Sequence, residues 1–373
     1  KANPAIGVCR VLERAGVDGA EIASSGELVA AMRAGFDPTR VLFAGPGKTD
    51  DELERAIRVG VGQINAESVG EIERVNAIAA KHTIVQGVGI RVNLEAKGSG
   101  HGKIVTGGGA QKFGIDESGV VTAIKLIESS ANIEFAGLHT MLGSQVLDAS
   151  RMLGSCAAAI EMAKRIGQQA GVSIGSLNFG GGLGVAHSDD DVAFDLEEFG
   201  VRLGELIDEA RGHERLAGTR FVIEPGRVLV SEYGVYVCRV VDVKDSGGKT
   251  FAILDGGIHH ALLPITANSY RMMVADRAGK QDAASAGVMI GGPLCTSADQ
   301  WRSEVELGEV RVGDVVVMMN SGAYGLTASM TMFLSRGTPA EVLVVDGEAH
   351  VIRERSTDEG LLDGQSIPKG LES

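Results

Sequence analysis

The chain has 373 residues, of which 44% are hydrophobic and 23% are charged, and its formal net charge is −14 at pH 7. This composition excludes a disordered chain, and because no run of about 18 apolar residues occurs, we expect no membrane span. The acidic balance disfavours a nucleic-acid partner, since phosphate backbones are bound by clustered Lys and Arg.

Up to about residue 227, short apolar runs alternate with segments of helical period, which is typical of βα units and a parallel sheet. The predicted strands are 21–24, 41–45, 63–66, 89–93, 135–141, 176–179 and 221–224. A closed barrel needs one strand more, so we expect an eighth strand and further chain upstream of Lys1. The sequence therefore predicts an α/β fold, a TIM-like (β/α)8 barrel.

Helix starts are marked between these strands. Thr49 precedes Glu52 by three residues, and Ser68 precedes Glu71 by three, so both pairs predict capping boxes. Apolar residues recur at three- and four-residue spacing in two further segments, as in helices that cover a sheet. These segments are 149–171 and 194–212.

After residue 227 the pattern changes to runs typical of β-strands, at 228–243, 250–254, 315–319 and 341–345. Ser246-Gly247-Gly248 predicts a tight turn between the first two. We therefore expect a barrel over residues 1–227 and a mainly antiparallel β domain over 228–373. No Pro-rich linker separates them, which favours tight packing of the two parts.

Chemically active residues stand at the predicted C-terminal strand ends, which face one site in a barrel. They are Lys1, Asn65, Glu67, Arg91, His139, the run 180–184 and the run 224–227. A lysine at a dry barrel rim can form a Schiff base with a cofactor aldehyde, and glycine N–H groups can bind a phosphate. An acid such as Glu224 can keep a pyridine nitrogen protonated. This set indicates pyridoxal 5′-phosphate (PLP).

Eleven segments, in the same order, are similar to the fold-type III PLP decarboxylases, the family of diaminopimelate, ornithine and arginine decarboxylases, with alanine racemase more distant. They are KANP, EIASSGEL, LFAGPGKT, INAES, KFGID, GLHTMLGSQ, LNFGGGLG, IEPGR, LDGG, GGPLCTSAD and SGAYG. The resemblance covers nearly the whole chain and implies a PLP-dependent amino acid decarboxylase, a carboxy-lyase.

The resemblance also implies residue roles. Lys1 would be the Schiff-base lysine, His139 would stack on the cofactor ring, and Glu224 would pair with the pyridine nitrogen. Other cofactor-binding residues, most of them at the phosphate, would be Arg91, Ser144, Gly180, Gly181, Gly182, Gly226, Arg227 and Tyr324. Cys295 would reach across from the second subunit of a head-to-tail homodimer with shared active sites, and would protonate the substrate carbon after CO₂ leaves.

The chain departs from the best-known family members where they hold the distal end of the substrate. Leu263 and Ala267 replace an Arg and a Tyr, and Thr296 replaces the acid that follows the cysteine. A buried charged substrate end without a partner would cost on the order of several kcal/mol. We therefore expect a neutral distal group.

Three segments, 255–260, 292–296 and 320–326, resemble a smaller branch that decarboxylates amino acids held as thioesters on acyl carrier proteins. This resemblance implies an acidic amino acid as substrate in natural-product biosynthesis, an acyl carrier protein as partner, and substrate contacts from Asp255 and Thr296. Carrier proteins are acidic, so docking needs a local basic patch. The candidates are Arg271, Arg277 and Lys280.

Other interpretations remain open: a decarboxylase of a free amino acid such as diaminopimelate or ornithine, a non-catalytic paralogue that binds or regulates, and a racemase, which GGPLC disfavours. His259 and His260 suggest a metal, yet no third ligand has useful spacing, so we expect none. The four cysteines lack CxxC or metal spacing, which favours reduced thiols and a cytoplasmic location.

Overall fold

The computed structural model describes residues 1–94, 110–141, 143–188, 190–262, 265, 270–275, 287–301 and 303–371. The chain divides into two compact units. The barrel unit consists of Lys1, Val8–Ala186 and Asp191–Leu229, and the β unit consists of Ala2–Gly7, His187–Asp190 and Val230–Ser373. Among the described residues, no helix combines the length and the apolar character that crossing a bilayer requires.

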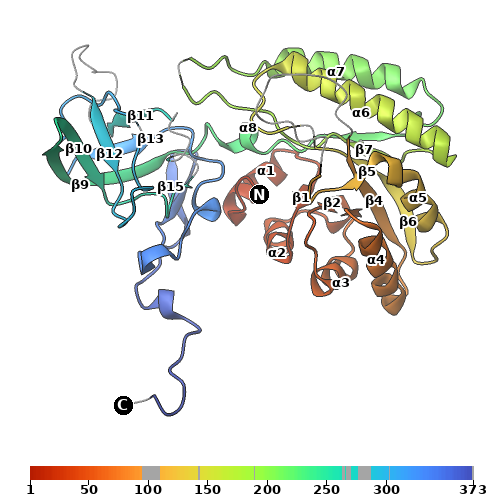
Figure 1. The fold of residues 1–373 in the computed structure, drawn as a ribbon, viewed down its shortest axis with the longest axis horizontal. Coiled ribbons are helices and arrows are strands. Elements are labelled where there is room, and N and C mark those ends of the chain that lie inside the picture. The colour runs from red at the N-terminus through yellow and green to blue at the C-terminus, as the bar shows by residue number, and fades with distance from the viewer. Residues whose placement is uncertain are drawn as a thin grey trace. The chain divides into compact units, whose positions relative to one another are not determined.

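Within the described residues, the barrel unit holds one parallel sheet whose strands follow one another in chain order (Figure 1). They are β1 (Ala20–Ile22), β2 (Val41–Phe43), β3 (Gln63–Ala66), β4 (Gln86–Asn93), β6 (Ile133–His139), β7 (Ser176–Asn178) and β8 (Arg220–Val222), with β5 (Ile115–Asp116) beside β4. The seven predicted strands are thus confirmed, and the fold is a TIM-like barrel with a C-terminal, mainly antiparallel β domain.

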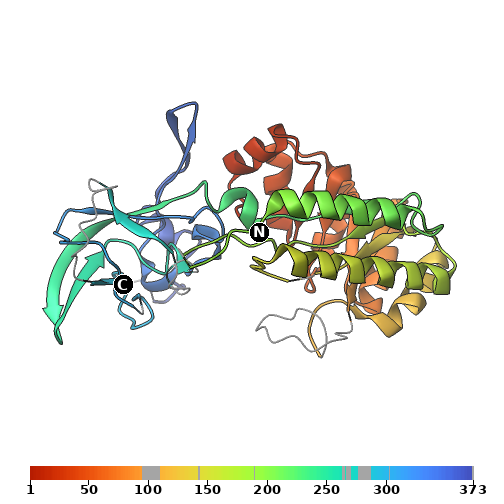
Figure 2. The ribbon, with the colours of Figure 1, turned by 90° about the horizontal axis from the view of Figure 1, so that it is seen from above.

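Helices alternate with these strands. They are α1 (Ile6–Arg14), α2 (Ser25–Ala34), α3 (Asp50–Val59), α4 (Val69–His82), α5 (Glu117–Glu128), α6 (Ala149–Ala170), α7 (Leu196–Arg211) and α8 (Arg227–Val230). The two long helices predicted at 149–171 and 194–212 are confirmed as α6 and α7, which lie side by side (Figure 2).

The two predicted capping boxes have different outcomes. At α3 the Thr49 hydroxyl accepts from the backbone N–H of Glu52, and the Glu52 carboxylate accepts from the backbone N–H of Thr49. This box is therefore confirmed. At α4 Ser68 does cap the helix, but the Glu71 carboxylate does not complete a box. It pairs instead with the buried amine of Lys48, a contact made by the tertiary fold and not by local sequence.

Strand alternation decides which side chains enter the barrel. Successive residues of a strand point to opposite faces of its sheet. Ile90, Leu138 and Leu177 are fully buried in the core that includes the helices. The residues that follow Ile90 and Leu138 are Arg91 and His139, which are register neighbours across β4 and β6. They therefore share the opposite, inner face.

The β unit contains one sheet and, among the described residues, a separate hairpin. The sheet has the order β11 (Met272–Val274), β13 (Val315–Met318), β9 (Tyr236–Ser246), β10 (Lys249–Leu254) and β12 (Val288–Gly291), and the hairpin pairs β14 (Glu341–Val345) with β15 (Glu348–Arg353). Only the pair of β10 with β12 is parallel among these described strands.

The prediction of a strand over 228–243 is wrong at its start, because residues up to Val230 form α8 and β9 begins at Tyr236. The predicted turn at 246–248 is confirmed, with φ of +59° at Gly247 and +76° at Gly248, the left-handed backbone that such hairpin turns need. Strands β11 and β12 have only three and four residues, too few for alternation to identify them.

Candidate active site

A carboxylate and an imidazole lie together at the C-terminal ends of β6 and β8. His139 is 2% exposed, and its Nε2 lies 3.6 Å from Oε2 of Glu224. Asn178, the last residue of β7, donates from Nδ2 to Oε1 of Glu224 and accepts from the backbone N–H of Gly180 at 2.8 Å. One amide thereby links the carboxylate to the glycine loop.

The charges around Glu224 keep it ionised. Burial alone would raise its pKa, but the nearby His139 ring, the hydrogen bond from Asn178 and the charge of Lys1 together lower the pKa below its ordinary value. Glu224 can therefore accept a hydrogen bond from a protonated ring nitrogen at neutral pH.

Glu21, the middle residue of β1, is a second acid of this cluster, which no sequence motif identified. Burial raises its pKa to about 7 and the charge of Glu224 adds to this effect, while His139 and Lys1 act in the opposite direction. EIASSGEL was recognised as a family segment, but only the folded barrel brings its first acid close to Glu224.

Lys1 contributes its charge to both acids, because it lowers the pKa of Glu21 and of Glu224. The Lys1 side chain is 59% exposed. Its amine is accessible to an aldehyde.

The glycine loop after β7 requires glycine at three consecutive positions. Gly180 and Gly182 have φ of +73° and +113°, which disfavours any side chain. A Cβ on Gly181 would lie 2.4 Å from the carbonyl oxygen of Glu224. The loop is therefore a tight cradle with backbone exposed to a ligand, a form suited to phosphate.

A second segment, 143–146, holds this cradle in place. The backbone N–H of Val146 donates to Gly182 at 2.9 Å, and the Gln145 amide pairs with both backbone groups of Val185, at 2.6 and 3.2 Å. Gln145 was not predicted as a site residue, and its φ of +55° is uncommon for a residue other than glycine. Ser144, a predicted phosphate contact, is exposed beside it.

Arg91 is held by an ion pair and an aromatic ring. Its Nη1 lies 3.1 Å from Oε1 of Glu67, and its guanidinium lies 4.4 Å from the centre of the Phe113 ring. Glu67 also accepts from the backbone N–H groups of Gly45 at 2.8 Å and Gly114 at 3.0 Å. The carboxylate thus fixes the arginine on the inner face of the barrel.

The remaining predicted phosphate contacts belong to different units. Gly226 and Arg227 are half-buried at the start of α8. Tyr324 is in the β unit, where its backbone N–H donates to the carbonyl of Ala2 at 2.7 Å. Ala2 directly follows Lys1 in the chain.

The β unit also carries Cys295 and the two predicted substrate residues. Cys295 is exposed. The Thr296 hydroxyl accepts from the backbone N–H of Ala298 at 3.3 Å, and the exposed Asp255 carboxylate accepts from the backbone N–H of Arg239 at 2.8 Å.

His259 and His260 are buried, and their rings lie 3.7 Å apart. Both nitrogens of His260 are occupied, by the Tyr236 hydroxyl at 2.9 Å and the Gly337 carbonyl at 3.0 Å. Burial lowers the pKa of His259 to about 4, and the neighbouring His260 adds to this effect. Both imidazoles are therefore neutral at physiological pH.

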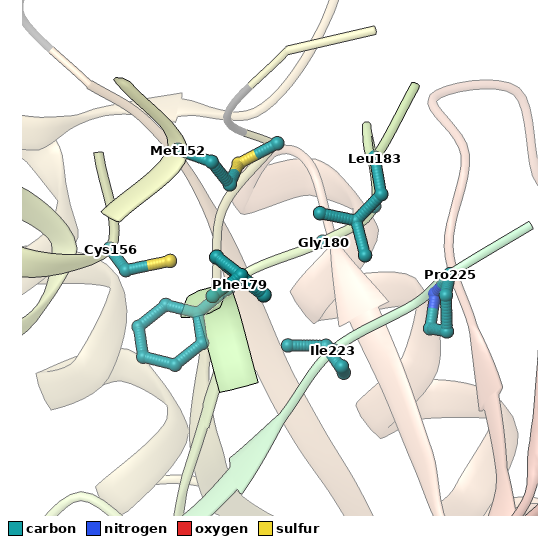
Figure 3. A pocket seen from close by; sticks show the side chains of 9 residues that line it. Met152, Cys156, Phe179, Gly180, Leu183, Ile223 and Pro225 are labelled. Carbon is teal, nitrogen blue, oxygen red and sulfur yellow. The ribbon is translucent and has the colours of Figure 1, made fainter. Parts of the chain in front are cut away.

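Beside the glycine loop lies a small pocket with an empty volume of about 240 Å³ (Figure 3). It is lined by Met152, Cys156, Phe179, Gly180, Gly181, Leu183, Phe199, Ile223 and Pro225. Burial raises the pKa of the Cys156 thiol to about 12, so this thiol is unreactive. The pocket shares Gly180 and Gly181 with the glycine cradle, and Ile223 and Pro225 of its lining are the chain neighbours of Glu224.

The barrel cluster fits PLP. The buried His139 ring has no hydrogen-bond partner at either nitrogen in the described part of the chain, so it is free to pack against a cofactor ring. The ionised Glu224 suits a protonated pyridine nitrogen, and the glycine cradle suits a phosphate.

The family described as "Pyridoxal-dependent decarboxylase, pyridoxal binding domain" matches residues 1–231. The chain belongs to the pyridoxal-dependent decarboxylases. It is accordingly a fold-type III carboxy-lyase with PLP as cofactor, as the sequence predicted, and the racemase and the non-catalytic interpretations are disfavoured.

The relatives that match nearly the whole chain have two different activities. The chain is 34% identical to the L-glutamyl-[BtrI acyl-carrier protein] decarboxylase of Niallia circulans, covering 98% of this chain and 86% of the relative. It is also 34% identical to the diaminopimelate decarboxylase of Methanothermobacter thermautotrophicus, covering 100% and 85%. A crystal structure of diaminopimelate decarboxylase from M. jannaschii matches with a TM-score of 0.91 at 27% identity, covering 99% and 84%. Family membership therefore leaves the substrate open.

The individual roles of Lys1, His139, Cys295 and the phosphate residues stay predictions. Leu263 and Ala267, where the family clamp is replaced, lie outside the described residues, as do Arg277 and Lys280 of the predicted basic patch.

Proposed function

We propose that this decarboxylase removes the α-carboxylate of an acidic amino acid held as a thioester on an acyl carrier protein. The observation that carries the proposal is Thr296, directly after Cys295, where relatives acting on free diamino acids have an acid. Its hydroxyl is neutral and is already used by the N–H of Ala298. A distal ammonium group would find no counter-charge from this residue.

The histidine pair supports the proposal in a second way, because it argues against a free carboxylate at the distal end of the substrate. His259 and His260 stand in the segment that resembles the carrier-protein branch, and burial lowers the pKa of both. Neutral imidazoles offer no cation to a free carboxylate, and desolvating an unpaired carboxylate is costly. A thioester avoids this cost because it has no charge.

In the proposed reaction, bound PLP supplies an electron sink next to the α-carbon of the substrate. Lys1 holds the cofactor through its amine, and His139 packs against the ring. Glu224 accepts a hydrogen bond at the ring nitrogen and so keeps that nitrogen protonated. Cys295 donates the proton that the α-carbon takes up once CO₂ has left.

We also propose a homodimer in which each site combines Lys1 of one subunit with Cys295 of the other. The support is the family resemblance together with an exposed cysteine in the β unit. A subunit alone would then lack the proton donor.

The test is to incubate the enzyme with L-glutamyl- and L-aspartyl-carrier proteins and to measure intact mass. Decarboxylation lowers the mass of the carrier by about 44 Da, the mass of CO₂. Free glutamate, aspartate, ornithine and diaminopimelate are assayed in parallel for CO₂ release, with Lys1→Ala as the inactive control.

We expect turnover of a carrier-bound acidic amino acid to exceed that of every free amino acid by at least about a hundredfold, which corresponds to roughly 2.7 kcal/mol of transition-state stabilisation. Efficient turnover of free diaminopimelate or ornithine would overturn the carrier proposal while leaving the decarboxylase assignment intact.

A further inference from the structure

Two loops of the β unit meet at one buried carboxylate. The first, the histidine loop, comprises residues 255–260, and the second, the cysteine loop, comprises residues 292–299. We infer that Asp299 is a positioning residue that holds Cys295 in place for proton transfer. This inference deepens the proposed function and rests on the proposed role of Cys295.

The carboxylate bridges the two loops through their backbones. Asp299 is 3% exposed, and its Oδ1 accepts from the N–H of Ile258 at 2.8 Å. Its Oδ2 accepts from the N–H of Leu294 at 2.9 Å. Each oxygen therefore serves a different loop, and Leu294 is the residue directly before Cys295.

Two glycines make room for this bridge. A Cβ on Gly257 would lie 2.2 Å from Oδ1 of Asp299, and a Cβ on Gly292 would lie 2.2 Å from Oδ2. Each distance is shorter than any real Cβ contact. Both loops thus carry glycine where the Asp299 carboxylate passes, which favours a built arrangement over a chance contact.

The cysteine loop is closed on itself around the same residue. The N–H of Gly292 donates to the carbonyl of Asp299 at 2.8 Å, and the N–H of Thr296 donates to the carbonyl of Leu294 at 2.8 Å. Leu294 is 6% exposed and belongs to the core of the β unit. Cys295 is exposed between these two anchors, so its thiol is presented from a rigid support.

Rigidity matters for this step because proton transfer depends on the distance and direction between donor and carbon. A displacement of about 1 Å at a reacting group can cost roughly a hundredfold in rate. A freed cysteine loop would slow the protonation.

The experiment uses the holoenzyme with Asp299→Asn. The amide keeps one acceptor oxygen but turns an NH₂ donor toward the other backbone N–H, so one of the two loops loses its bond. We expect amide exchange of the peptide spanning 292–299 to accelerate about tenfold. We expect kcat to fall at least about tenfold, since the change acts on the transition state.

Asp314→Asn is the matched control, because the Asp314 carboxylate also accepts from a backbone N–H, that of Arg311 at 2.9 Å, in the turn before β13. It should leave kcat and the exchange of the cysteine loop unchanged. Gly257→Ala is the second variant, since it displaces the same carboxylate from the histidine loop. In the Asp299→Asn background it should add less than about twofold to either effect.

Faster exchange with an unchanged kcat would overturn the inference, and so would unchanged exchange. An additive effect of Gly257→Ala would do the same. If Asp299→Asn does not fold, the Gly257→Ala holoenzyme tests the inference alone. The measurements are its kcat and the amide exchange of its peptide 292–299. Cys295→Ala distinguishes failure of the proposed function from failure of this inference. Full activity of Cys295→Ala would refute the proposed role of the thiol. Faster exchange of the cysteine loop in Asp299→Asn would still show that Asp299 bridges the two loops.

Discussion

Replacement of Glu21 by glutamine tests the electrostatics of the barrel site. The pKa of Glu21 is raised from 4.5 to about 7, by burial first and by Glu224 second. The folded protein therefore binds a proton between pH 4.5 and about 7 that the unfolded chain does not bind. Stability falls as pH rises through this window, and the loss is complete above pH 7.

The size of the effect follows from the shift. Each unit of pKa difference is worth about 1.4 kcal/mol, so the ionised Glu21 lowers the free energy of unfolding by about 3 kcal/mol above pH 7. The neutral amide of the Glu21→Gln variant does not ionise. We therefore expect this variant to be about as stable as the wild type at pH 4.5 and clearly more stable at pH 8.

The assay is urea unfolding of the cofactor-free protein from pH 4.5 to pH 8, with the difference between variant and wild type plotted against pH. Glu128→Gln is the comparison, an exposed acid at the end of α5. A stability difference for Glu21→Gln that is constant across this range would refute the reasoning.

Three further results are expected. Gly181→Ala should weaken PLP binding at least about tenfold in an absorbance titration, because its Cβ would lie 2.4 Å from a carbonyl oxygen; Gly204→Ala, with nothing within 4 Å, should not. Mixed Lys1→Ala and Cys295→Ala subunits should regain about a quarter of wild-type activity if sites are shared, and none otherwise. Glu67→Ala should lower stability by about 1–3 kcal/mol in thermal melts, since three donors lose their acceptor; an unchanged melt would contradict this.

Much of the fold could be predicted because its signals are local. A βα unit has a period-two run followed by a helical period, so strands such as 63–66 were located to the residue. The cap of α3 was also predictable, since Thr49 and Glu52 act on each other directly. At α4 the same local signal failed for Glu71, because Lys48, 23 residues away, competes for the carboxylate.

The residues of the site also differ in whether local sequence predicts them. Motifs identified the glycine loop, His139 and Glu224, since their residue types and strand-end positions follow from the sequence alone. Asn178 and Glu21 were not identified, because their importance comes from Glu224, which is 46 positions from Asn178 and 203 from Glu21 in the chain.

The sequence by itself therefore determined the barrel, the cofactor and the class of reaction, because each depends on residue types in a fixed order along the chain. Only the tertiary structure decided the charge state of Glu224, the raised pKa of Glu21 and the bridge made by Asp299. The physical reason is that burial and charge act through space, and folding alone sets which groups are buried together.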